Sequence, residues 1–553
     1  MIERRLYVAW KQHIVRRFRR NAQRAASLQR ELLFEKLRRE ADSDFGREHG
    51  LDKIRTVEEF RRQLPLANYE YYRPYVERVK NGDVRALYGP STKVLMFAMT
   101  SGTTSASKYI PVTNHFFREY RRSWNVWGLN VYKNHPELLR LKTLQFSSDW
   151  QQTRTPGGYY CGNISGLAAD TRPWIANLVF MLPTAINKIS DAESKQYTAL
   201  RLAMARNDVG IAITANPLTL IGLARMADQH KESLIRDIHN GSLSSHVQMK
   251  DEIRRKLNSR IGKADPRRAR ELEQMADREG HLWPRDYWPQ MSVLAIWTGA
   301  AMAPYVPQVQ EYFGDVTFRD HGLSASEGRM TTPLEANCSA GVLDVSTHYF
   351  EFIPEEEHGS PNPTILEAHE LEQDRNYFLV MSTSSALWRH DIHDVVKCVG
   401  FEGQAPILDF MNKGAHYSSM TGEKLSENQV VNAVRAAMRE FELKFEFFTL
   451  APVFGDPPHY ELLVEGDLDA TVKQQFAEAI DRHLAEMNCE YDNRIETGRM
   501  HGTVIRSLPP GSWTAFHNEV LSREGASLEQ FKHPCLTNKL DFIDRMQNPS
   551  RVH

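Results

Sequence analysis

The chain has 553 residues, a formal net charge of −1, and 41% hydrophobic against 25% charged residues. This length exceeds that of an ordinary single domain, so we expect more than one domain. The near-zero net charge argues against nucleic acid as a partner. No run approaches the roughly 20 apolar residues that are needed to span a bilayer.

The amino-terminal stretch 1–20 and the cysteines indicate the compartment. The stretch lacks an uninterrupted apolar core and a small-residue cleavage site, so we expect no secretory signal. The cysteines lie too far apart for a disulfide framework or a CxxC metal motif. We therefore expect a reduced, cytoplasmic protein without zinc. The cysteines are Cys161, Cys338, Cys398, Cys489 and Cys535.

Apolar residues recur at a spacing of four near the amino terminus, for example Leu6, Trp10 and Ile14. This periodicity predicts a helical lead-in over 1–44 that packs on the body of the protein. Its polar face is rich in arginine, so a helix that binds a membrane surface or nucleic acid is the alternative.

Short apolar runs that lead through a turn into a helical pattern repeat along the chain. The runs 94–99, 209–215 and 291–297 each have this form, and 376–383 with 393–401 resembles a further pair of strands. Alternation of this kind predicts an α/β core with buried strands.

A domain boundary is expected near 407–412. Beyond it, helical patterns at 427–441 and 468–487 flank two strand-like runs. That combination predicts a small α+β module of a common domain size. The predicted organisation is a large domain over 1–408, a mobile α+β domain over 409–545, and a tail over 546–553.

The stretch from Thr100 to Lys108, TSGTTSASK, follows a predicted strand. Backbone N–H groups, hydroxyls and a lysine can together surround phosphate. The stretch is not a Walker loop, because GxxxxGK[ST] is absent. On its own, it is equally consistent with a solvated turn that precedes a helix.

Two acidic segments could serve a nucleotide. HGLSASEG, 321–328, places Glu327 among small residues, where one carboxylate can hold Mg²⁺ together with phosphate oxygens. LWRHDIHDVV, 387–396, places Asp394 at the start of a strand, where a carboxylate can accept hydrogen bonds from ribose. Metal binding by the His and Asp residues of the second segment is not favoured, because their spacing does not make ligands face one another. Beyond the boundary, TGEKL could deliver Lys424 from a mobile domain.

The order and spacing of these segments resemble the acyl-acid-amido synthetase family, known in plants as the auxin-responsive promoter family. That family belongs to the acyl-adenylate-forming superfamily of luciferases and acyl-CoA ligases. The resemblance covers roughly residues 30–540. It is carried by LPLANYEYYRPYVERVKNGD, TSGTTSASKYIPVT, WTGAAMAPYVPQVQEYF, HGLSASEG, HYFEFIPEEE, LWRHDIHDVVKCVGF, MTGEKLSENQ and GASLEQFKHPCL.

The resemblance implies a role for each matching residue. Phosphates would be contacted by Ser101, Gly102, Thr103, Thr104 and Lys108. The adenine and the acyl carboxylate would be bordered by Thr298, Gly299, Leu323, Ser324 and Ser326. Glu327 would hold Mg²⁺, Asp394 would bind ribose, and Lys424 and Lys532 would come from the carboxy-terminal domain. The acyl pocket would be lined from the helix after the loop by Tyr120, Arg121 and Trp124.

Several positions depart from the family pattern and indicate a divergent, bacterial-type branch. The backbone of the loop has less conformational freedom where the family usually has a glycine, and the tyrosine that usually stacks on the adenine is missing. These departures are Ala106 and Ser107 in the loop, Leu323 in place of tyrosine, His393 in place of glycine, and Asn412-Lys413 in place of arginine.

The sequence thus predicts a cytoplasmic, ATP- and Mg²⁺-dependent ligase that adenylates a carboxylic acid and transfers the acyl group to an amine, which the family resemblance implies is an amino acid. The alternatives are an acyl-CoA ligase-like enzyme, a catalytically silent nucleotide-binding homologue, or a protein that acts through its basic amino-terminal helix. A screen that detects released pyrophosphate, run with and without amino acids, would separate the amide-forming ligase, the acyl-CoA ligase-like enzyme and the silent homologue.

Overall fold

The computed structural model describes most of the chain, and its residues group into two compact units. Unit 1 contains 1–299, 305–392 and 397–409, and unit 2 contains 300–304, 393–396 and 410–553. The described residues are 2–100, 108–173, 176, 178–414, 417–418, 420, 423, 425–455, 457–496, 500–524 and 532–547.

Unit 1 begins with helices, and the predicted helical lead-in is confirmed as a pair rather than a single rod. The backbone turns between the first two helices, where the Arg24 N–H donates to the Asn21 carbonyl at 3.1 Å. The second helix buries Leu33 and Leu37 against the rest of the unit. The helices are α1 Ile2–Ala22, α2 Ala25–Glu40, α3 Asp44–Glu48, α4 Val57–Gln63 and α5 Tyr69–Lys80.

A four-stranded sheet in the order β2-β1-β5-β4 carries the predicted phosphate stretch. The predicted helix after this stretch is confirmed, and a strand that the sequence did not predict, β2, lies between the two and buries Ile110 and Val112. Helix α6 begins only after Thr113, whose hydroxyl accepts a hydrogen bond from the Phe116 N–H at 3.1 Å. The elements are β1 Val94–Thr100, β2 Lys108–Thr113, α6 Asn114–Asn134, β4 Thr153–Arg154 and β5 Tyr160–Gly162.

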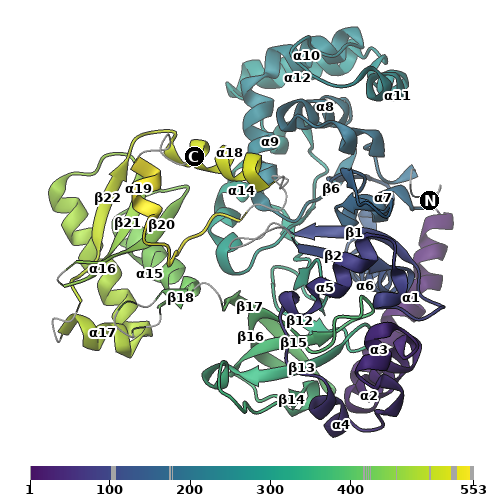
Figure 1. Ribbon diagram of the computed structural model, residues 1–553. Coiled ribbons are helices and arrows are strands. Elements are labelled where there is room, and N and C mark those ends of the chain that lie inside the picture. Colours follow the sequence, from purple (N-terminus) through teal and green to yellow (C-terminus); the bar gives the residue numbers. More distant parts are fainter. Residues whose placement is uncertain are drawn as a thin grey trace. The chain divides into compact units, whose positions relative to one another are not determined.

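The predicted α/β core is confirmed by a four-stranded, all-parallel sheet in the order β3-β6-β7-β8. Every residue of β6 is buried, as expected for a strand covered on both faces. The strands are β3 Lys142–Gln145, β6 Val209–Ile213, β7 Val293–Ala295 and β8 Thr317–Phe318. The charged segment after β6 is helical, and α8, α10, α11 and α12 gather at one end of the unit (Figure 1). The helices of this region are α7 Ile164–Asp170, α8 Ala192–Met204, α9 Pro217–Gln229, α10 Lys231–Asn240, α11 Asp251–Ile261, α12 Pro266–Glu279, α13 Pro284–Tyr287 and α14 Val306–Phe313.

A seven-stranded sheet has the order β11-β12-β17-β16-β15-β13-β14. The predicted strand pair is confirmed, since β15 and β16 are neighbours in this sheet. Strand β17 runs through the expected domain boundary, so the boundary itself stays a prediction. The strands are β11 Thr331–Thr332, β12 Gly341–Leu343, β13 Tyr349–Pro354, β14 Leu366–Glu367, β15 Asn376–Ser382, β16 His390–Glu402 and β17 Ala405–Lys413.

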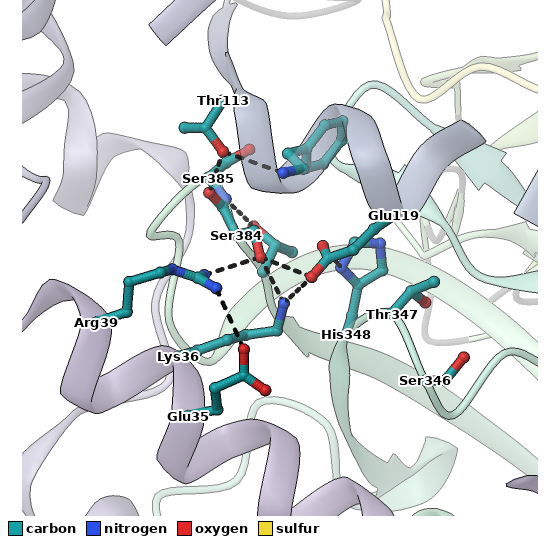
Figure 2. Close-up of polar contacts among 12 residues, drawn as sticks. Glu35, Lys36, Arg39, Thr113, Glu119, Ser346, Thr347, His348, Ser384 and Ser385 are labelled. Carbon is teal, nitrogen blue, oxygen red and sulfur yellow. Dashed lines mark hydrogen bonds and ion pairs between the residues drawn. The ribbon is translucent and has the colours of Figure 1, made fainter. Parts of the chain in front are cut away.

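A buried polar cluster joins α2, α6 and the loop after β15 (Figure 2). Lys36 is fully buried and donates to Glu119 Oε1 at 2.6 Å and to the Ser384 hydroxyl at 2.5 Å. Ser384 in turn donates to the same carboxylate at 2.8 Å, and its carbonyl accepts from Thr113. His348 Nδ1 lies 3.9 Å from the other oxygen of Glu119. This set, which we term the scaffold cluster, fixes the start of α6.

In unit 2, helices cover a three-stranded sheet of order β20-β21-β22. Leu450, Leu462 and Phe476 lie in its core. The predicted pair of helices and pair of strands is confirmed. Strand β22, three further helices and a separate two-stranded sheet of β18 Tyr417–Ser418 and β19 Leu425–Ser426 accompany them among the described residues. The elements are α15 Glu427–Glu440, β20 Phe448–Val453, β21 His459–Glu465, α16 Ala470–Met487, α17 Cys489–Glu496, β22 Val504–Leu508, α18 Ser512–Glu524 and α19 Phe542–Gln547. Among the described residues, no helix is both long and apolar enough to cross a membrane.

Candidate active site

The ends of the predicted phosphate loop are held together by the sheet, because Thr100 and Lys108 are paired across β1 and β2. Lys108 is half-buried, and its Nζ lies 5.8 Å from the centre of the Tyr69 ring. The Tyr69 hydroxyl donates to the Tyr109 carbonyl at 3.0 Å, which fixes the ring beside the first residue of β2. Of the predicted phosphate contacts, Ser101, Gly102, Thr103 and Thr104 lie outside the described residues, as do Ala106 and Ser107.

A two-residue hairpin presents the predicted magnesium ligand. Strands β9, Ser324–Ala325, and β10, Gly328–Arg329, are paired, and Ser326 and Glu327 form the turn. Gly328 is required there because a Cβ atom would collide with the imidazole of His348. Glu327 is 8% exposed, and its Oε1 lies 4.0 Å from His390 Nε2.

His390 is the residue on which the loop and the hairpin converge. It is buried, and its Nδ1 lies 3.2 Å from the Ala67 carbonyl oxygen. Burial lowers the pKa of His390, the Glu327 carboxylate opposes this shift, and the Lys108 ammonium adds to it. Lys108 and Glu327, far apart in sequence, therefore lie within electrostatic reach of one imidazole. From the sequence, His390 was considered only as a possible metal ligand, and that role was not favoured.

A second carboxylate, missed by sequence reasoning, organises the predicted adenine border. Asp320 accepts from the Thr298 N–H at 2.5 Å, the Thr298 hydroxyl at 2.8 Å and the Gly322 N–H at 2.7 Å. Burial raises the pKa of Asp320 to about 6, and these hydrogen bonds oppose the rise. The Leu323 N–H donates to the Thr331 hydroxyl at 2.8 Å. The chain is thereby fixed on both sides of His321.

Gly299 stands beside this carboxylate network in a tight place. A Cβ atom at Gly299 would lie 2.9 Å from the Cβ atom of Ser339, so a larger residue would displace its neighbour. Ser339 donates to Asp409 Oδ1 at 2.8 Å. The predicted adenine-border residues Thr298, Gly299, Leu323 and Ser324 thus share one locality in unit 1.

Two of the three predicted acyl-pocket residues share an aromatic cluster. The guanidinium of Arg329 lies 4.2 Å from the centre of the Trp124 ring, and that centre lies 5.1 Å from the centre of the His321 ring. Tyr120 stacks edge-on against Trp124 at 6.3 Å. Arg121 has other contacts, since its guanidinium lies 5.7 Å from the Phe117 ring centre.

The charge states in this aromatic cluster follow from burial. Burial lowers the pKa of His321 to about 3, and Arg329 adds to the shift, so the imidazole is neutral at physiological pH. Burial lowers the pKa of Arg329 to about 10, which leaves the guanidinium charged. Sequence reasoning missed both residues, although each belongs to or directly follows the HGLSASEG segment.

The remaining predicted residues belong to unit 2. Asp394 is buried on β16 within the stretch 393–396. His393, the departure from the family glycine, has φ +57°, a left-handed conformation that glycine adopts more easily. Lys532 Nζ lies 5.5 Å from the centre of the Phe410 ring. Lys424 lies outside the described residues, and Asn412 and Lys413 are described in backbone only.

The fold and site define a two-unit α/β protein in which a strand–loop–strand stretch and an acidic hairpin meet at a buried histidine. Comparison with known families gives the lineage. Residues 14–318 match the GH3 family N-terminal domain, 341–413 its central domain and 428–541 its C-terminal domain. The chain belongs to the GH3 family, the family that the sequence motifs indicated.

Curated relatives agree with this assignment. The chain is 27% identical over 546 residues to indole-3-acetic acid-amido synthetase GH3.8 of Oryza sativa subsp. indica, with 92% of the chain and 88% of the relative covered. It is 24% identical to indole-3-acetic acid-amido synthetase GH3.3 of Arabidopsis thaliana, at the same coverage.

Solved structures show the same fold. GH3.15 acyl acid amido synthetase has a TM-score of 0.85 at 19% identity, covering 96% of this chain and 95% of that one. AtGH3.15 in complex with 2,4-DB has a TM-score of 0.86, also at 19% identity, covering 97% and 96%. The predicted fold class is confirmed.

Proposed function

We propose that the protein is an acyl-acid amido synthetase, an AMP-forming ligase that uses ATP to activate a carboxylic acid and then joins it to an amino acid. Membership of a family whose curated relatives are amido synthetases supports this function. Within the structure, one observation supports it: the buried carboxylate of Glu327 lies 4.0 Å from His390 Nε2, and the Lys108 ammonium contributes to the lowered pKa of the same imidazole.

The described residues fit the magnesium ion that this chemistry requires. The Glu327 carboxylate is buried, and among the described residues it has no hydrogen-bond donor within reach. It is therefore available as the single protein ligand typical of Mg²⁺ on a nucleotide. When bound, Mg²⁺ would neutralise phosphate charge. His390 stays neutral because burial lowers its pKa, so it leaves the negative charge of Glu327 uncompensated for a cation.

Alignment and charge neutralisation are the tasks of the protein in the first half-reaction. The acid's carboxylate oxygen attacks the α-phosphorus of ATP, the bond to the β-phosphate oxygen breaks, and pyrophosphate leaves. Lys108 would stabilise the growing negative charge, together with Ser101, Gly102, Thr103 and Thr104. Thr298, Gly299, Leu323, Ser324 and Ser326 would border the adenine and the acyl carboxylate.

In the second half-reaction the amine attacks the acyl carbon, AMP leaves, and the amine proton passes to solvent. Asp394 would hold the ribose. Lys424 and Lys532 would be supplied by a mobile domain over 409–545, and rotation of that domain between half-reactions suits two chemical steps at one site. The acyl group would lie against Tyr120, Arg121 and Trp124. We also propose a cytoplasmic location, which the free cysteines Cys161, Cys338, Cys398 and Cys535 support.

The test is ATP–pyrophosphate exchange over a panel of carboxylic acids, followed by product analysis with pooled amino acids or with coenzyme A. We expect exchange with at least one acid and an amide product with amino acids. A thioester formed only with coenzyme A would instead indicate an acyl-CoA ligase. Absence of exchange with every acid, despite measurable ATP binding, would indicate a silent nucleotide-binding homologue.

A further inference from the structure

Arg329, on strand β10, is a buried cation whose donors are mostly unused. It is 1% exposed, and its Nη2 donates to the His321 carbonyl at 2.5 Å. Its Nε and Nη1 are buried and have no hydrogen-bond partner in the part of the chain that the structure describes. Among the described residues, no carboxylate lies within 4.0 Å of the guanidinium. A buried charge that lacks both a counter-ion and hydrogen bonds is costly, and native proteins rarely retain one without a function.

The nearest acidic groups are already engaged elsewhere. Asp320 accepts hydrogen bonds from Thr298 and Gly322. Asp344 accepts from the Ser123 hydroxyl with one oxygen and from the Ser346 hydroxyl, at 2.6 Å, with the other. Both carboxylates therefore stabilise Arg329 only through space. The described residues thus leave the Nε and Nη1 donors unpaired.

The surroundings of the guanidinium define what could pair with it. The Trp124 ring lies against one face at 4.2 Å, and Tyr120 and the neutral His321 imidazole complete an aromatic wall. The His321 Nε2 atom is also buried, with no hydrogen-bond partner among the residues that the structure describes. An anion carried on a flat or apolar body would satisfy the guanidinium and pack on these rings.

We propose that Arg329 binds an anionic group of the acid substrate that is distinct from the carboxylate to be activated. The substrate class is then dicarboxylic acids with a short apolar or aromatic body. This inference rests on the proposed ligase function, and it adds a specificity-determining residue to it.

Spacing along the hairpin favours the second anion over the reacting one. Glu327, the proposed magnesium ligand, marks the end where the carboxylate is activated, and Arg329 stands two residues further along. Two residues of strand span roughly 7 Å, close to the separation of the carboxylates in a benzene-1,4-dicarboxylate. The reacting carboxylate must also keep an oxygen lone pair for attack on phosphorus, which pairing with a guanidinium would weaken.

The first arm of the test measures kcat/KM for pyrophosphate exchange with matched acids: benzoate against terephthalate, and hexanoate against adipate. For the wild type we expect the diacid to exceed its monoacid by at least about tenfold. Arg329→Met should lose about 100-fold on the diacids and little on the monoacids, because only the diacids leave a charge unpaired. Arg329→Lys should restore part of the preference.

Arg319→Met is the matched control. Arg319 resembles Arg329 in being 1% exposed, in donating from Nη2 to one carbonyl, that of Leu334 at 3.1 Å, and in having an Nη1 atom without a hydrogen-bond partner among the described residues. It differs because it stacks on no described aromatic ring. Any loss of activity in Arg319→Met should be equal on monoacids and diacids. If Arg319→Met changed the preference for diacids over monoacids as much as Arg329→Met does, the proposal would be overturned. The loss of any buried arginine would then explain the effect.

The second arm needs no turnover and separates this inference from the ligase function. Terephthalate without ATP should raise the Tm of the wild type and of Arg329→Lys, but not of Arg329→Met. This shift in Tm would support anion binding at Arg329 even if no acid supported pyrophosphate exchange. In that case only the proposed ligase function would fail. No shift in the wild type, equal use of monoacids and diacids, or equal losses on both in Arg329→Met would each overturn the proposal.

Discussion

Lys36 and Arg329 are both buried cations of unit 1, and they differ in what surrounds the charge. Lys36, in the scaffold cluster, lies 2.6 Å from a carboxylate oxygen of Glu119 and 2.5 Å from the Ser384 hydroxyl. Among the described residues, Arg329 has one carbonyl partner and two nitrogens without any. The charge of Lys36 is therefore paired within the described part of the chain, whereas that of Arg329 is not.

Both regions contain buried atoms without a hydrogen-bond partner among the described residues. Near the hairpin of β9 and β10 these are His321 Nε2 and His390 Nε2, and in the scaffold cluster they are Glu119 Oε2 and His348 Nδ1. The contrast therefore lies in the cation itself: Lys36 is paired with a carboxylate, and Arg329 has no such partner among the described residues.

The largest effect is expected in the scaffold cluster. Lys36→Met should lower the free energy of unfolding by about 3–5 kcal/mol, because Glu119 would remain buried and unpaired. Urea unfolding followed by circular dichroism measures the change. Adding Glu119→Leu should recover most of the loss. Lys256→Met, which breaks the exposed Lys256–Glu252 pair, is the surface control, with an expected change below about 0.5 kcal/mol.

Lys108→Ala should lower the rate of adenylation by about 100-fold, because one preorganised positive charge is lost from the phosphates. Its stability should change little, since Lys108 makes no ion pair with the described residues. ATP–pyrophosphate exchange measures the rate, with exposed Lys93, at the other end of β1, as the matched Lys93→Ala control. Unchanged exchange would remove Lys108 from the mechanism.

Glu327→Gln should raise the Mg²⁺ concentration needed for half-maximal activity by at least about tenfold, because the metal loses a charged ligand. A magnesium titration of initial rates at fixed ATP measures the shift. The neutral amide is close in shape, so thermal unfolding should report an intact fold. A normal magnesium requirement would rule out the proposed role of this carboxylate.

Asp394→Ala should raise the KM for ATP about fivefold, with kcat less affected, because two hydrogen bonds to ribose are lost. Initial rates against ATP give both constants. The same substitution should leave the KM for the acid unchanged. If the KM for ATP does not move, Asp394 does not hold the ribose.

Arg329→Met should change the free energy of unfolding by less than about 1 kcal/mol, the smallest effect of the series. The substitution leaves no counter-ion behind, in contrast to Lys36→Met, so the usual penalty for breaking a buried pair is absent. The same urea measurement places the two variants on one scale. A loss of several kcal/mol would show that Arg329, like Lys36, serves the fold.

Sequence reasoning reached most of the strands and helices because apolar periodicity reports burial directly. It missed β2 because the sequence KYIPVT lies between a polar loop and a strong helical pattern, and its residues are compatible with either. It found Lys108 and Glu327, which stand in motifs with a recognisable order. It missed Asp320, His321 and Arg329, because their roles depend on contacts with Thr298 and Trp124 that no local spacing reveals.

Gly328 connects the hairpin of β9 and β10 with the scaffold cluster through a steric contact. The space that a side chain would need at Gly328 is occupied by His348, the same imidazole that faces Glu119 in the scaffold cluster. Glu119 and Trp124 moreover lie on one helix, α6, with Glu119 toward the cluster and Trp124 toward Arg329. A disturbance of the buried ion pair would thus reach the hairpin that carries Glu327 by steric contact, so we expect a substitution in the scaffold cluster to alter kinetics before it causes unfolding.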